Sequence, residues 1–167
     1  MICILNQSLK MFSVIERIMS EKLGFKTKPA DIVFHRDIFI PKELVEYLSG
    51  QRIQIYPSAH VEKEKIDKEY MKTDIYVPPS YFYKVVEVNP NSIIEVGISW
   101  DGDLQHLLLR YPYNEEWDII LAISYPSGKV KTFWFNRRGD IHRTLEKGYY
   151  TYPEQWARLK SRVRIGA

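Results

Sequence analysis

The chain has 167 residues, of which 45% are hydrophobic and 27% are charged, and this composition argues against a disordered chain. A single cysteine, Cys3, excludes an internal disulfide framework and a cysteine-based zinc site. No apolar run approaches the roughly 20 residues that a membrane-spanning helix needs, and the first residues lack the basic region of a signal peptide. We therefore expect a soluble, cytoplasmic protein that has no membrane partner, and the net charge of +3 alone says little about other partners.

The first part of the chain predicts mainly helices. Residues 8–23 carry apolar side chains at helical spacing, and a short strand is expected at 38–40. A proline then opens a second helix over 41–50. Residues 52–56 alternate as a strand does, and 59–72 form a charged helix with a narrow apolar stripe.

The second part of the chain predicts strands. Short turns join these strands, which implies an antiparallel meander, and Pro153 opens a final helix. We therefore expect an α+β fold with N-terminal helices packed on one face of a four- to five-stranded antiparallel sheet and with a C-terminal helix. Residues 1–50 are expected to form a helical arm, and residues 51–167 one α+β domain. The expected strands cover residues 83–88, 94–100, 105–111, 117–124 and 129–136.

Basic residues concentrate near the C-terminus. From Lys129 onward the chain has ten basic and three acidic residues, which gives +7, whereas the first 128 residues carry −4. Several aromatic residues, among them Tyr149 and Trp156, share this stretch. A basic surface with aromatic rings can hold a polyanion and stack bases, and the alternative is a solvated basic face over an aromatic core.

The search for known catalytic motifs is mostly negative. The sequence contains no glycine-rich phosphate loop, no HExxH metal motif and no GxSxG elbow. Residues 142–144 form one H-x-T triplet, whereas the two-histidine phosphoesterases need two. We therefore expect neither a metal ion nor a cofactor.

Dispersed polar residues remain as candidates for chemistry. Cleavage of RNA without a metal needs a base for the 2′-hydroxyl, a cation beside the phosphorane and an acid for the leaving 5′-oxygen. His, Lys, Arg and Thr side chains can fill these roles. The candidates are His60, Lys63, His106, Arg110, Thr132, Asn136, His142, Arg143 and Thr144.

The order of these residues resembles a nuclease family. One passage, 53–63, reads as a strand leading into a helix that begins with a histidine and has a lysine three residues on. A second, 106–110, is a strand ending in arginine, and a third runs over 119–145 as strand, turn and strand. In this order, residues 52–149 resemble the barnase/EndoU/colicin/RelE-like nuclease superfamily, most closely its phage-associated members.

The resemblance implies a metal-independent endoribonuclease or a toxin-like protein that cleaves RNA. It also implies RNA as the partner, tRNA being one candidate, and an immunity or antitoxin protein as a second partner. Residues 1–50 lie outside the resemblance, and a homodimer through them is one expectation. The implied catalytic residues are His60, Lys63, Arg110, Thr132 and His142, and the implied RNA-binding residues are Lys131, Asn136, Arg143 and Tyr149.

Other interpretations stay open. The fold can serve a nucleic-acid-binding protein that has no catalytic activity, or an assembly protein of a mobile element. His60 can be a helix-capping or surface residue, and Arg110 can pair with a carboxylate such as Glu115 or Glu116. A nuclease site predicts that potential acids and bases converge on one face, whereas a binding protein needs only a basic aromatic surface.

Overall fold

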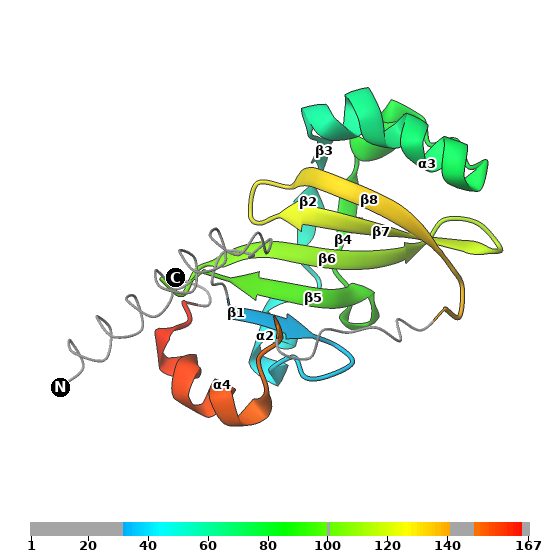
Figure 1. Cartoon of the computed structure of the whole chain (residues 1–167). Helices are drawn as coiled ribbons and strands as arrows, with labels where there is room; N and C mark the ends of the chain where they lie inside the picture. The colour runs from blue at the N-terminus through cyan, green and yellow to red at the C-terminus, as the bar shows by residue number, and fades with distance from the viewer. Residues whose placement is uncertain (1–31, 100, 141–148, 165–167) are drawn as a thin grey trace, which may run out of the picture.

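The computed structural model describes residues 32–99, 101–140 and 149–164. A six-stranded sheet forms its centre, in the spatial order β1-β5-β6-β7-β8-β3 (Figure 1). A separate two-stranded sheet pairs β2 (Arg52–Gln54) with β4 (Val85–Glu87). The strands of the central sheet are β1 (Ile32–His35), β3 (Tyr56–Pro57), β5 (Ile93–Ile98), β6 (Leu104–Pro112), β7 (Trp117–Ser124) and β8 (Lys129–Arg137).

The described part of the chain contains three α-helices. Two of them begin where a proline sets the backbone for helix entry: α2 (Lys42–Leu48) directly follows a proline, and α4 (Pro153–Leu159) has one at its first position. A π-helical turn (Val61–Lys65) leads directly into α3 (Ile66–Thr73). Short 3-10 turns lie at Pro79–Phe82, Pro90–Ser92 and Lys160–Arg162.

The four strands β5 to β8 form a consecutive antiparallel meander, as their alternating sequence predicts. Two strands from elsewhere extend it. At one edge β1 pairs antiparallel with β5, and at the other edge β3 pairs parallel with β8. The turn between β7 and β8 needs a glycine, since Gly128 has a φ of +84° and a Cβ atom there would lie 2.1 Å from the carbonyl oxygen of Gln54. This close approach brings the β2–β3 segment beside β8.

One face of the central sheet carries the hydrophobic core. Side chains that alternate along the strands point to this face, and the helices and turns cover them. Leu44 and Leu48 of α2 are fully buried against it, as are Val61 of the π-helical turn and Phe82. Each such side chain contributes roughly 1.5–3 kcal/mol when it leaves water. The sheet residues of this core include Leu107, Leu109, Ile119, Leu121, Ile123, Phe133 and Phe135.

The C-terminal helix closes the β1 edge of the molecule. The ring of Trp156 in α4 meets Phe34 of β1 edge-on, with ring centroids 5.5 Å apart. The backbone N–H of Thr151 donates to the carbonyl oxygen of Val33. The predicted C-terminal helix is therefore confirmed, and α4 lies beside β1 in Figure 1. Its Trp156 side chain is buried.

The predicted fold arrangement is wrong, although the class is α+β. The sheet has six strands and is mixed, because β3 runs parallel to β8. The helices of the described residues are spread along the chain rather than gathered at its N-terminus. The physical reason is that single short strands, β1 and β3, add to the sheet edges from positions far away in sequence, where alternation gives no hint of the partner.

Other predicted elements have mixed outcomes. The helix expected over 41–50 is confirmed as α2, whereas 52–56 divides between β2 and β3 in different sheets. Instead of a strand over 38–40, Phe39 makes only a single bridge to His35. The helix expected over 8–23 lies outside the described residues.

The domain boundary expected after residue 50 stays a prediction, and the described residues before it belong to the central sheet and its core. Residues 32–35 form β1 of the central sheet, and α2 buries its apolar side chains in the same core. Of the described helices, none has the length and apolar character to span a bilayer.

Candidate functional site

The face of the sheet opposite the core carries a row of polar side chains, which we call the polar face. In β6 the buried Leu107 and Leu109 point to the core, so the alternate residues His106 and Arg110 point the other way. The same alternation places Thr132 and Asn136 of β8 on this face, and strand pairing adds the remaining members. The polar face comprises His35, Glu95, His106, Arg110, Asp118, Thr132 and Asn136.

A carboxylate and an imidazole meet near the β1 edge of the polar face. The Nε2 atom of His106 lies 3.2 Å from Oε1 of Glu95, and the two side chains are mostly buried. Since a carboxylate only accepts hydrogen bonds, Nε2 carries the proton, and Nδ1 of a neutral ring keeps a lone pair. The His106 side chain is 23% exposed, so a ligand can reach it.

A glycine makes room for this imidazole. Gly97 pairs with His106 across the two strands, and a Cβ atom at position 97 would lie 1.8 Å from the ring atom Cε1. Any other residue at 97 therefore forces the ring to move. Gly97 fixes the ring against β5, two residues away from the carboxylate that the ring binds.

Two further side chains complete the cluster. The hydroxyl of Tyr150 donates to Oε2 of Glu95 over 3.4 Å, and its ring meets His35 edge-on at 5.1 Å between centroids. Nδ1 of His35 accepts the backbone N–H of Asp37, which places the proton of a neutral His35 ring on Nε2. We call His35, Glu95, His106 and Tyr150 the imidazole cluster. It combines proton acceptors and proton donors within one contact network.

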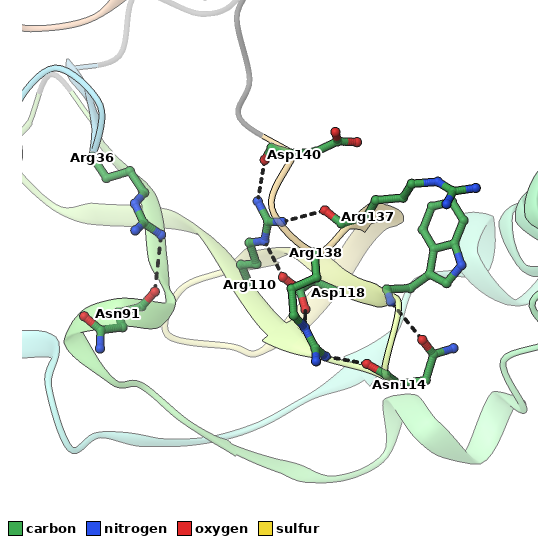
Figure 2. A network of polar contacts seen from close by, with 9 residues as sticks. Arg36, Asn91, Arg110, Asn114, Asp118, Arg137, Arg138 and Asp140 are labelled. Carbon is green, nitrogen blue, oxygen red and sulfur yellow. Dashed lines mark hydrogen bonds and ion pairs between the residues drawn. The ribbon is translucent and has the colours of Figure 1, made fainter.

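A second polar network lies at the other end of β6 (Figure 2). Arg110 donates from Nε to Asp118 at 2.9 Å, from Nη1 to the carbonyl of Asp140 at 3.3 Å and from Nη2 to the carbonyl of Arg137 at 3.2 Å. Arg138 binds the second carboxylate oxygen of Asp118 and the carbonyl oxygen of Asn114. Because all three guanidinium nitrogens of Arg110 are engaged, the network ties the end of β8 to β6 and β7.

A pocket of about 600 Å³ lies beside this network. One wall comes from the turn after β1, and the opposite wall from the ends of β6 and β7. Tyr111 lines it, and the Tyr111 phenol packs against the core and donates to the carbonyl of Glu87. Burial raises the pKa of Tyr111, so this phenol stays protonated. His35 also lines the pocket, so the pocket adjoins the imidazole cluster.

The structure does not bring His60 and Lys63 to the polar face. The helix that carries them packs through Val61 and Ile66 into the core, on the other side of the sheet. His60 is 46% exposed, and its polar contact is with Glu64 four residues later, at 3.5 Å. Within the described ranges, no polar contact joins these two residues to Arg110 or Thr132. The interpretation of His60 as a surface residue fits this placement.

The remaining predicted residues have different positions. Thr132 and Asn136 share the polar face with Arg110, as expected of neighbouring strands, and Lys131 is exposed on β8. Tyr149 is half-buried and packs against Tyr150. Arg110 pairs with a carboxylate, as one interpretation held, but its partner is Asp118 rather than Glu115 or Glu116. His142, Arg143 and Thr144 lie outside the described residues.

Sequence reasoning missed most of the imidazole cluster. Glu95 stands in the apolar run Ile93–Ile98, where a charged residue and a glycine two positions later are both unusual for a buried strand. That pair of residues was the available signal. His35 and Tyr150 gave none, because only folding brings them beside Glu95. Among the described residues, no group of three or more metal-ligating side chains is assembled.

Three comparisons with known proteins complete the description of the site. No protein-family model matches the chain, no curated protein is similar to it, and no solved structure matches the fold. The resemblance of residues 52–149 to the nuclease superfamily therefore stays a prediction, and any function must be argued from the geometry.

Proposed function

We propose that this protein cleaves RNA without a metal ion, using the Glu95–His106 pair for proton transfer. The observation that carries the proposal is the 3.2 Å contact between carboxylate and imidazole on the polar face, held in place by Gly97. A carboxylate that binds one ring nitrogen fixes the tautomer and leaves the other nitrogen as a base. The proposal agrees with the nuclease resemblance but moves the site from His60 to His106.

The chemistry divides between the members of the imidazole cluster. Nδ1 of His106 takes the proton of the 2′-hydroxyl, and the 2′-oxygen attacks phosphorus while Glu95 stabilises the imidazolium. The bond from phosphorus to the 5′-oxygen then breaks and leaves a 2′,3′-cyclic phosphate. The leaving oxygen departs on the opposite side of phosphorus, so a second group supplies its proton. Tyr150 and His35 are the other proton-bearing side chains of the cluster.

Arg110 has a structural role in this proposal. Its three nitrogens already donate to protein oxygens, and it lies four residues along β6 from His106, which is about 13 Å in an extended strand. One phosphate cannot reach both side chains. This is why the proposal does not retain Arg110 as the cation that stabilises the phosphorane.

The test is cleavage of RNA in excess EDTA by the wild type and three variants. We expect wild-type activity with cyclic-phosphate ends, and a loss of about 10²–10⁴-fold in His106→Asn and in Glu95→Gln. His60→Asn is the matched control and should retain full activity. Circular dichroism establishes that each variant is folded. The proposal fails if folded wild type leaves RNA intact, or if His60→Asn rather than His106→Asn loses activity.

A second function is favoured by one observation, the engagement of Arg110 in protein contacts. If no cation serves the phosphorane, the polar face binds RNA and does not cut it. Lys131, exposed on β8, and the half-buried Trp134 then provide charge and a stacking surface. Retention of RNA by the folded wild type, with no cleavage at long incubation, would favour this non-catalytic function.

A further inference from the structure

The pocket beside the imidazole cluster has the size of a small-molecule site. Its volume of about 600 Å³ lies within the range of roughly 300–1,000 Å³ that is typical of such pockets. Figure 2 shows Arg36 and Asn91 on one side and Arg110 with Asp118 on the other. Because His35 belongs both to the pocket wall and to the cluster, a ligand in the pocket lies next to the proposed reaction site.

The charges around the pocket nearly cancel. Arg110 and Arg138 both bind Asp118, so this carboxylate is neutralised inside the wall. In Figure 2 the carboxylate of Asp140 points away from the Arg36 side, and its backbone oxygen faces Arg110. The network of Arg110, Arg138 and Asp118 keeps one positive charge, which the carboxylate of Asp140 balances in number. At the rim, Arg36 and Asp37 balance each other. This balance favours an uncharged ligand with hydrogen-bonding groups over a free anion.

The walls favour a flat ligand. Each of the three guanidinium nitrogens of Arg110 donates to a protein oxygen along the edge of the group. The flat face of the guanidinium is therefore the surface that remains for a ligand. Such faces stack on nucleobases. Ile94, Tyr111 and Pro112 add apolar surface to the same pocket.

We propose that the pocket binds a nucleobase that has an exocyclic amino group. The base stacks on the guanidinium of Arg110, and its amino group donates a hydrogen bond to the carboxylate of Asp37. The proposal rests on the proposed function, since it makes RNA the source of the base. Asp37 is suited to this role because its carboxylate is 42% exposed and its backbone N–H is tied to His35, which fixes its position at the rim. A carboxylate accepts from amino groups, which adenine, cytosine and guanine have and uracil lacks.

The test uses nucleosides, which have no phosphate and therefore report binding separately from cleavage. Adenosine, cytidine, guanosine and uridine are titrated into the full-length protein and followed by amide NMR shifts. We expect shifts at Asp37 and Asn91, with affinity for the amino-bearing nucleosides about 10-fold higher than for uridine. Asp37→Asn should remove this preference, whereas the matched control Asp101→Asn, at an exposed turn away from the pocket, should keep it.

Three outcomes would overturn the base pocket. Uridine could bind as tightly as the other nucleosides, the shifts could map to another surface, or inorganic phosphate alone could produce the same shifts. The proposed function fails independently. Cleavage of RNA with no nucleoside binding removes only the base pocket, and nucleoside binding without cleavage removes only the nuclease.

Discussion

The imidazole of His106 rests on Gly97 so closely that even a methyl group at position 97 would overlap it, at 1.8 Å from Cε1. The contact fixes β5 against β6, because the missing side chain of Gly97 leaves a space that the His106 ring fills. It also explains why Glu95 and Gly97 occur two residues apart, for the first binds the ring and the second admits it.

Gly97→Ala should therefore displace the His106 ring, although the substitution itself adds and removes no charged group. We expect RNA cleavage to fall by about 10²-fold, because a shift of about 1 Å in a catalytic group has such an effect. The free energy of unfolding should fall by about 1–3 kcal/mol from overpacking, measured by denaturant titration.

A double-mutant cycle checks the cause of that loss. In a His106→Ala background the ring is absent, so Gly97→Ala should lower the free energy of unfolding by less than it does in the wild type. We expect a coupling energy of at least about 0.5 kcal/mol. An equal cost in both backgrounds would show that the ring does not occupy the gap in solution.

The ion-pair network at the end of β6 should contribute strongly to the free energy of unfolding. Asp118 is buried and binds both Arg110 and Arg138, so Asp118→Asn leaves two guanidinium groups without their carboxylate. We expect a loss of about 3 kcal/mol in the free energy of unfolding. The exposed Asp101→Asn is the control and should change it by less than about 0.5 kcal/mol. Equal effects of the two variants would contradict the structural role of Asp118.

Alkaline pH should destabilise the protein through Tyr81. Burial raises the pKa of Tyr81 to about 12, so between pH 10 and pH 12 the folded state keeps a proton that the unfolded state releases. The contribution to stability is fully present below pH 10 and disappears as pH rises through 12. Tyr81→Phe should flatten this alkaline loss in denaturant titrations, whereas Tyr76→Phe, at a tyrosine that is 59% exposed, should not.

Binding of RNA should depend on salt through the exposed lysine of β8. In the His106→Asn background the RNA stays intact, and Lys131→Ala should reduce the slope of log affinity against log salt by about 0.7 to 1. Lys42→Ala on α2, which packs on the core side of the sheet, is the control and should leave the slope unchanged. Unchanged slopes in both variants would place the RNA away from β8.

The alternating strands were predictable because one face of each is buried, as Leu107, Leu109, Phe133 and Phe135 show. The edges of the sheet were not. Around Ile55 the alternation continues without a break, yet the backbone before it pairs with β4 and the backbone after it pairs with β8. The alternation of side chains indicates which residues are buried. It does not indicate which neighbouring strand forms the backbone hydrogen bonds.

The candidate site was predicted only in part. The sequence favoured a polar site on the sheet, and Arg110, Thr132 and Asn136 do share one face. It could not identify the carboxylate partner of Arg110, because Asp118 reaches it across strands. Glu95 was overlooked for the same reason, since its contact with His106 depends on the register of β5 against β6.

The strand order has a consequence for synthesis of the chain. β1 is translated before any strand it can join, and its ladder waits until Glu95 and its neighbours in β5 exist. Without β1, the fully buried β5 would be an edge strand of the sheet. A nascent chain therefore contains the apolar strand β1 without its partner for a long stretch of elongation. A fragment that starts at residue 51 would lack β1, so the backbone of β5 would stay unpaired at the sheet edge and prone to aggregation.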